Sequence, residues 1–208
     1  MALTKVIGNG LGTLGDGTAN DTKIVFDGNA QDYHIGLDDS SDSLTIGLGS
    51  ALGTTSHMVI DANGHITKAN NPSFRAMGNN AAYQTTSVVP FPSVSGTNLG
   101  GHNTGSHYNT SNYRFTAPVA GRYLMHVHMG IVRITANSGN GYPYIRINGT
   151  NVAYSYVHVP TGTAYHPANI TQIVELAAND YVDVTYGGGN SDYYGNYTEL
   201  SFSGCLIG

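Results

Sequence analysis

The sequence predicts an all-β protein, and three observations lead to this fold class. Glycine accounts for 28 of the 208 residues, whereas charged residues make up only 10%. Long amphipathic helices need many charged residues and leucines, and the sequence is poor in both. Short segments alternate apolar and polar residues, and turn sequences such as Asn-Gly separate them, which is typical of strands joined by tight turns.

The first part of the chain contains very short candidate strands. A turn at Asp27-Gly28 ends the first of them, and Asn63-Gly64 lies between the last two, where it predicts a hairpin. Each segment contributes only two or three apolar side chains to a core. We therefore expect this part to associate with identical copies of itself, because it cannot build a core alone. The candidate strands are residues 24–26, 33–37, 44–48, 58–60 and 65–67.

The remainder of the chain contains longer candidate strands. In the segment 112–134, five apolar side chains from Tyr123 to Ile131 recur at every second residue and share one face. Turn sequences separate this segment from the later ones, and no helical period lies between them. Strands at this spacing predict a sandwich or a barrel. The other candidate strands lie in residues 142–149, 152–159, 169–186 and 200–208.

Charge and aromatic residues divide the chain into two parts. Residues 1–73 hold eight Asp, three Lys and one Tyr, so the whole net charge of −5 lies there. The following residues balance five Arg against five acidic residues and hold fourteen Tyr. This asymmetry predicts an assembly or docking module over residues 1–71 and a second domain over residues 72–208.

The composition also disfavours several classes of protein. A net charge of −5 without a basic patch disfavours a nucleic-acid partner. The single cysteine, Cys205, excludes an intrachain disulfide framework. No apolar run reaches the about 20 residues of a membrane helix. The first residues lack the apolar run of a signal peptide, so we expect the chain to be made and folded in a cytoplasm.

A series of motifs in the second part occurs in a recognisable order. It opens with a Pro-x-Phe strand and continues with Val-Pro-Phe, a Gly/Asn/Tyr loop at 96–113, Phe-Thr-x-Pro-x-x-Gly-x-Tyr, an Asn-Asp turn before Val-x-Val, and Phe-Ser-Gly-x-Leu. Over about 135 residues this order resembles the complement globular-head and tumour-necrosis-factor-like jelly-roll family. The matching segments are Pro72–Phe74, Val89–Phe91, Phe115–Tyr123, Asn179–Val184 and Phe202–Leu206.

The resemblance implies a ten-stranded jelly-roll sandwich that packs as a tight homotrimer. The collagen stalk usual in the family is absent, because the sequence has no Gly-x-y period. The first part is instead similar to the Gly/Asp/Asn-rich segments of bacteriophage fibre and tail proteins. Together, the two likenesses imply a trimeric β-structured fibre that ends in a jelly-roll head.

Two histidines suggest a possible metal site. His126 and His128 are two residues apart in a candidate strand, so both imidazoles point to one face and six would meet on the axis of a trimer. Family members carry a similar His-x-His strand without an implied metal role. We therefore favour ordinary packing for this pair and keep metal binding as the alternative.

The late loop 187–199 is the best candidate for a binding site. Tyr193, Tyr194 and Tyr197 provide flat rings that can stack on sugars or pack between protomers. Asn196 and Asp192 add groups that can bind hydroxyls, and the pair Asp192 and Glu199 adds a possible calcium site. The acidic loop 38–42 also has the right oxygens for calcium, but it lacks the spacing of a known calcium loop and is better interpreted as a hairpin turn.

Other groups receive structural interpretations. Tyr142, Tyr144, Tyr154 and Tyr156 alternate on two neighbouring strands and predict an aromatic layer on a sheet face or between subunits, rather than a ligand site. No nucleophile motif and no His-Glu-x-x-His occur, so we expect no enzymatic activity. Paired carboxylates for glycan cleavage lack support as well, because Asp180 and Asp183 have turn and strand-surface explanations.

The sequence therefore predicts a bacteriophage virion structural protein. We expect a homotrimeric fibre, knob or decoration protein that needs no cofactor and attaches to a glycan or protein of the host surface. Its N-terminal module is expected to contact other virion proteins. The alternatives are a secreted or surface-displayed recognition module and a glycan-cleaving tail spike.

Overall fold

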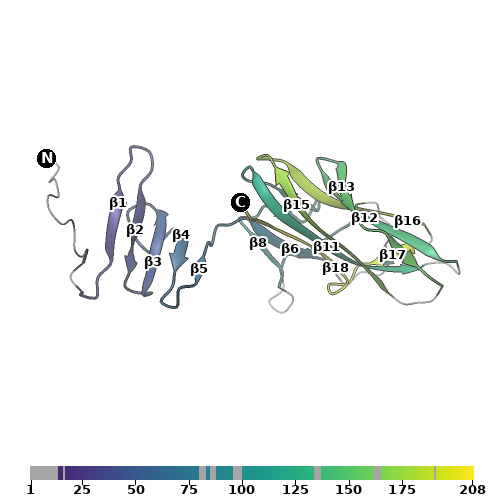
Figure 1. Ribbon diagram of the computed structural model, residues 1–208, viewed down its shortest axis with the longest axis horizontal. Coiled ribbons are helices and arrows are strands. Elements are labelled where there is room, and N and C mark those ends of the chain that lie inside the picture. The colour runs from purple at the N-terminus through teal and green to yellow at the C-terminus, as the bar shows by residue number, and fades with distance from the viewer. Residues whose placement is uncertain are drawn as a thin grey trace. The chain divides into compact units, whose positions relative to one another are not determined.

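The computed structural model describes residues 14–15, 17–79, 83–84, 88–95, 100–133, 137–161, 165–189 and 191–208. All regular secondary structure in these ranges is β-strand, which confirms the predicted all-β class (Figure 1). None of the described residues belongs to a helix that could cross a membrane. The chain separates into two compact units, Met1–Asn70 and Asn71–Gly208.

The first unit is one antiparallel sheet of five strands in the order of the chain. The sequence predicted these strands, and most of their bounds agree within two residues. Asn63-Gly64 lies in the turn before β5, with Gly64 at φ 83°. Residues 39–42 form the turn between β2 and β3, as predicted for the acidic loop. The strands are β1 (Thr22–Phe26), β2 (Tyr33–Asp38), β3 (Ser43–Leu48), β4 (Ser56–Ile60) and β5 (Ile66–Thr67).

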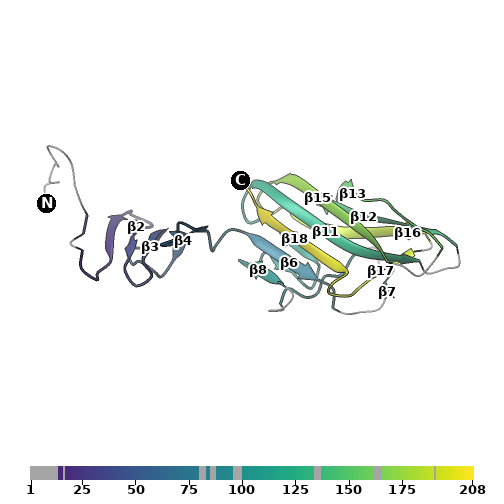
Figure 2. The same ribbon diagram turned by 60° about the horizontal axis from the view of Figure 1, so that its bottom comes forward.

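The second unit is a sandwich of two sheets. One sheet has the strand order β7-β17-β11-β18-β6-β8, and β15 pairs with the free edge of β11. The other has the order β13-β12-β16-β10-β9, and β14 pairs with β12. Figure 2 shows the two sheets as layers, with β11 and β18 in one of them.

Thirteen strands are described in this unit rather than the implied ten, because short strands occur in the predicted loop 96–113 and because predicted strands are interrupted. The predicted strand 152–159, for example, divides into two short strands at residues 155–156. The strands are β6 (Ser73–Met77), β7 (Tyr83–Gln84), β8 (His102–Thr104), β9 (Tyr108–Asn109), β10 (Arg114–Thr116), β11 (Gly121–Arg133), β12 (Gly139–Ile147), β13 (Thr150–Tyr154), β14 (Val157–Val159), β15 (His166–Leu176), β16 (Tyr181–Gly189), β17 (Ser191–Tyr194) and β18 (Leu200–Leu206).

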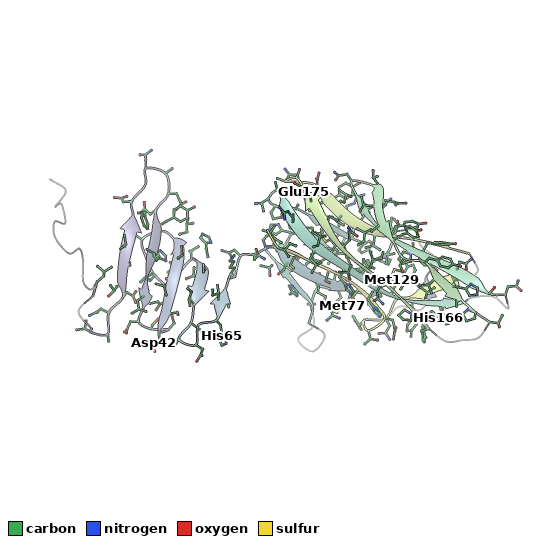
Figure 3. The ribbon with its side chains drawn as sticks, viewed as in Figure 1. Asp42, His65, Met77, Met129, His166 and Glu175 are labelled. Carbon is green, nitrogen blue, oxygen red and sulfur yellow. The ribbon has the colours of Figure 1, made fainter. Side chains whose placement is uncertain are left out.

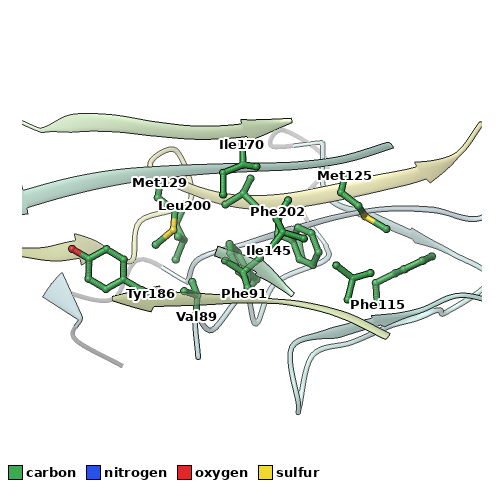
Figure 4. Packing of buried hydrophobic residues seen from close by; sticks show 14 of the residues in the cluster. Val89, Phe91, Phe115, Met125, Met129, Ile145, Ile170, Tyr186, Leu200 and Phe202 are labelled. Carbon is green, nitrogen blue, oxygen red and sulfur yellow. The ribbon is translucent and has the colours of Figure 1, made fainter. Parts of the chain in front are cut away.

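The hydrophobic core fills the space between the two sheets (Figure 4). Alternate residues of β11 from Tyr123 to Ile131 are wholly buried, as their spacing predicted. Met77 and Met129 lie inside the sandwich, whereas Glu175 points to its surface (Figure 3). Burial of these side chains supplies the main favourable free energy of folding.

Four aromatic rings, two from each sheet, pack against one another in this core. The Phe74 ring on β6 lies 4.8 Å from the Phe115 ring of the opposite sheet, 5.0 Å from Tyr108 and 4.8 Å from Phe202. The first two contacts are stacked and the third is edge-on, which are favourable geometries for aromatic pairs. All four side chains are at most 3% exposed.

The two units differ sharply in the apolar area that they bury. Among the described residues of the first unit, only Leu52 is a buried hydrophobic residue, whereas the second unit holds the whole connected core. A sheet without a buried apolar layer lacks the main term that offsets chain entropy.

Truncation of Phe74 should strongly destabilise the second unit. Phe74→Ala leaves a cavity among three rings, and we expect it to lower the free energy of unfolding by about 3–5 kcal/mol. Val152→Ala is the matched control, because Val152 is 45% exposed on β13 and such surface changes stay within about 0.5 kcal/mol. Denaturant melts at one protein concentration measure both. Equal effects would show that the ring cluster does not hold the sheets together.

The two units should also differ when they are made separately. We expect residues 71–208 to unfold in one cooperative transition, because they contain the core. Residues 1–70 alone should show no such transition. Circular dichroism melts of the two fragments provide the measurement, and a cooperative melt of residues 1–70 would contradict the expectation.

Candidate functional site

The region predicted as one long loop at 187–199 is largely strand in the structure. β16 continues to Gly189, and β17 covers Ser191–Tyr194; residue 190 lies outside the described residues. β17 pairs with β11 through the register Ile131–Tyr193 and Val132–Asp192. The prediction of a continuous exposed loop was therefore wrong, because β17 lies inside a sheet, between β7 and β11.

Tyr193 points into the sandwich and cannot contact a receptor. Its side chain is wholly buried, and its ring lies 5.1 Å from the Tyr186 ring in an edge-on contact. The Tyr186 hydroxyl in turn lies 2.7 Å from the hydroxyl of Ser191. The alternation of the strand explains this outcome, because Tyr193 shares the inward face with its register partner Ile131.

The remaining residues of the predicted binding site lie closer to the surface. Tyr194 is half-buried, and its ring lies 5.3 Å from the exposed ring of Tyr165. Asn196 and Tyr197 are also half-buried, and the Asn196 side chain accepts a hydrogen bond from the backbone N–H of Thr198 at 3.3 Å. These residues retain some accessible surface, but much less than an open loop would offer.

The two carboxylates of the predicted calcium site lie beside the same strand. Asp192 is the register partner of Val132, and the side chain of Glu199 lies over Gly130, which has no Cβ to block it. Asp192 is 8% exposed, and its Oδ1 has no hydrogen-bond partner. Burial raises the pKa of Asp192. The described residues contain no group of three or more His, Cys, Asp or Glu side chains suited to a metal ion, so calcium binding stays a prediction.

His126 and His128 lie on the outer face of β11, as the spacing predicted. Their Nδ1 atoms lie 2.9 Å from the Thr171 hydroxyl and 2.8 Å from the Asn169 side-chain oxygen, both on the neighbouring strand β15. Burial lowers the pKa of His126, and the nearby His128 and Arg75 lower it further. These contacts explain both histidines as packing across the sheet. Metal binding by the pair stays a prediction, since the described residues contain no group of three side chains suited to a metal ion.

A shallow depression of about 200 Å³ adjoins these histidines. Leu124, His126 and His102 line it together with Cys205, the only cysteine of the chain. The cysteine is half-buried at the end of β18 and forms no disulfide. The depression belongs to the outer face of the β11 sheet, beside the histidine pair.

An exposed group of aromatic side chains lies on the other sheet. The rings of Tyr142 and Tyr156 lie 5.3 Å apart, and those of Tyr144 and Tyr154 lie 5.8 Å apart. Tyr154 is 65% exposed and Tyr156 is 54% exposed. The predicted aromatic layer therefore exists on a sheet face. We call these four residues the tyrosine layer.

Polar groups border the tyrosine layer. The Tyr156 hydroxyl donates to the Asn140 side-chain oxygen at 3.0 Å, and the His158 Nδ1 lies 3.1 Å from the same oxygen. These contacts hold the Tyr156 ring in a fixed orientation at the surface. A ligand would therefore meet flat apolar rings rimmed by hydroxyl and amide groups.

An ion network supports the same sheet and was missed from the sequence. Arg146 donates to both carboxylate oxygens of Asp183, at 2.7 and 2.9 Å, and Arg114 donates to the same carboxylate at 3.3 Å. The Arg114 guanidinium also lies 4.0 Å from the centre of the Tyr181 ring. Asp183 is 1% exposed, so its interpretation as a strand-surface residue was wrong. The two arginines neutralise a buried carboxylate, which explains the network by structure alone.

Asp192→Asn should raise the stability of the protein at neutral pH. Burial raises the pKa of the folded carboxyl, so its charged form is costlier in the folded chain than in the unfolded chain. The wild type should approach the variant in stability as the pH falls from 7 through the raised pKa. Melting curves at several pH values measure this. Asp180→Asn is the contrasting variant and should lower stability at neutral pH, because hydrogen bonds from Asn148 and Ala177 lower the pKa of Asp180. If calcium binds here instead, added Ca²⁺ would stabilise the wild type and not Asp192→Asn.

Comparison with known proteins places this second unit in a family. The model of the C1q domain matches residues 73–207. The globular domain of zebrafish complement 1qA protein is 14% identical, and the match covers 66% of this chain and 98% of that one with a TM-score of 0.47. Eiger TNF from S. frugiperda is 10% identical, and its match covers 67% of this chain and 94% of that one with a TM-score of 0.48. No curated protein matches the sequence.

The family match spans the whole sandwich, from the first residue of β6 to the end of β18. Its bounds agree with the run of motifs from Pro72 to Leu206. The second unit thus has both the sequence pattern and the two-sheet fold that the resemblance implied. This chain belongs to the C1q domain family.

Proposed function

We propose that this chain is a trimeric attachment protein of a bacteriophage particle, in which the C1q domain is the head that contacts the host surface. Domains of the C1q and tumour necrosis factor families form homotrimers and typically act by recognition rather than catalysis. The acidic, glycine-rich first unit is similar in style to phage fibre segments. That it forms a compact unit of its own supports an assembly role on the particle, and no cofactor is needed for either role.

The tyrosine layer is the observation that carries the binding role of the head. A monomeric surface rarely presents a contiguous aromatic patch without a binding function. Tyrosine gives a large contact area at a low cost in side-chain entropy, and its hydroxyl can bind polar ligands. Tyr154 and Tyr156 are more than half exposed, whereas the tyrosines of the region 187–199 are buried or half-buried. We therefore propose the tyrosine layer as the contact surface for a host glycan or protein.

The trimer can be tested on the full chain. We expect light scattering coupled to size exclusion to give three times the chain mass of 21.9 kDa. The physical reason is the packing mode of the family, together with the apolar surface that the first unit leaves uncovered. A mass of one chain at micromolar concentration would overturn this part of the proposal.

The contact surface can be tested with two matched pairs of substitutions. We expect the double variant Tyr154→Ala with Tyr156→Ala to lower binding to host cells at least about tenfold, because each lost aromatic contact costs about 1 kcal/mol or more. Its mass and melting curve should stay close to those of the wild type, since both rings are largely exposed. Binding is measured with labelled protein on whole cells.

The double variant Tyr194→Ala with Tyr197→Ala is the comparison. It tests the region that the sequence favoured, and we expect binding to be retained. Loss of binding in this variant alone would move the contact surface to the region 187–199. Full binding by both variants would contradict a role for either group of tyrosines.

A further inference from the structure

Among the described residues of the first unit, the sheet has one apolar face that remains largely exposed. Apart from a register shift between β3 and β4 at Ile46–Gly47, the five strands pair in line, so alternate residues of all five strands share this face. Seven of these side chains are 39–60% exposed, which is unusual for residues of this type in the middle of a sheet. The apolar face consists of Ile24, Phe26, Tyr33, Ile35, Leu37, Leu44, Ile46, Leu48, Met58, Ile60 and Ile66.

The opposite face of the same sheet is polar, and part of it is buried. His34, Asp38, Ser43 and Thr45 are at most 7% exposed although all four are polar. Residues 49–55 lie against part of this polar face. The His34 Nδ1 lies 2.9 Å from the Gly49 carbonyl oxygen, the N–H of Leu48 donates to the Thr55 carbonyl at 2.9 Å, and Gly53 lies beside the Asp38 carboxylate. Within the described residues of the unit, this segment therefore packs on the polar face, whereas the apolar face stays largely exposed.

Charge and size indicate what covers the apolar face. The face carries no charged side chain, because Lys23 and Asp38 belong to the opposite face. Two identical copies can therefore meet there without repulsion between like charges. Five strands spaced about 4.8 Å apart and about five residues long give a face of roughly 400 Å². That is about half of what each partner contributes to a stable independent interface.

Covalent linkage of the first unit to the C1q domain compensates for the small area of the apolar face. The apolar face is joined in one chain to a C1q domain, and domains of this family form homotrimers. Linkage to a trimeric head raises the effective concentration of the first units to about the millimolar range. A small interface is then occupied without a large affinity of its own. An unlinked protein partner would have to bind this small, uncharged face without that advantage.

We propose that the apolar faces of three copies of this chain pack against one another and form a second trimer interface, separate from that of the C1q domains. One hollow on this face supports this arrangement: Ile24, Ile35 and Leu44 line a depression of about 270 Å³ together with Leu14, which precedes the sheet, and a side chain of another copy can fill it. The first unit folds as a sheet whose hydrophobic core is shared between chains. This inference rests on the proposed trimer, but it assigns a role to residues outside the C1q domain.

Thiol labelling of the full chain tests the apolar face directly. Cys205→Ser removes the only cysteine, and Ile46→Cys then places one thiol at the middle of the apolar face. Thr67→Cys is the control, because Thr67 is exposed on the opposite face of the same sheet. We expect a maleimide to label Ile46→Cys at least tenfold more slowly than Thr67→Cys. Leu44→Cys, also on the apolar face, serves if Ile46→Cys does not fold.

Paired charge substitutions provide a second, independent measurement. Ile24→Glu with Ile66→Glu places charges on the apolar face, whereas Lys23→Glu with Thr67→Glu places them at the neighbouring positions on the opposite face. We expect at least tenfold faster amide hydrogen exchange of β2 and β3 in the first variant and little change in the second. Light scattering should still give a trimer for both, because the C1q domains are unchanged.

The outcomes separate this inference from the proposed trimer. Equal labelling of Ile46→Cys and Thr67→Cys in a trimeric chain would overturn the shared core and leave the trimer intact. Protection of Ile46→Cys only after another protein is added would also overturn it, since a different partner would then cover the face. A monomeric full chain would overturn both the trimer and this interface.

Discussion

The structure of the C1q domain depends on the aromatic contact between its two sheets. Phe74 enters from β6 and meets Phe115 and Tyr108 of the opposite sheet, while Phe202 on β18 closes the group edge-on. The four rings come from three separate parts of the chain, so this contact joins β6 and β18 of one sheet to β9 and β10 of the other. The side chains on the outer faces of both sheets take no part in this packing.

The outer faces carry the features that bear on function. On one sheet, the buried Asp183 holds Arg146 and Arg114 in place, and the tyrosine layer lies beside this network. On the other sheet, β11 presents His126 and His128, each bonded to a polar side chain of β15. Rigid strands therefore position both sets of side chains. A binding surface on strands loses less conformational entropy on contact than one on a mobile loop.

The two units solve the problem of burial in opposite ways. The C1q domain packs two apolar faces against each other inside one chain. In the single sheet of the first unit, by contrast, residues 49–55 pack against the polar face. Burial of polar groups on this face lowers stability, as His34 shows: it is wholly buried and its Nε2 has no hydrogen-bond partner. A unit built in this way gains most of its stability from whatever covers its apolar side, which couples its folding to assembly.

The sequence by itself determined the all-β class, the alternation within β11 and the order of family motifs from Pro72 to Leu206. These features are local, because alternation and turn residues act over a few positions. Only the tertiary structure decided that Tyr193 faces the core, that Asp183 is buried between two arginines, and that the first sheet leaves its apolar face open. A period of two separates the faces of a strand, but contacts between distant segments decide which face is covered. Arg114 and Asp183 are 69 residues apart, and no local pattern joins them.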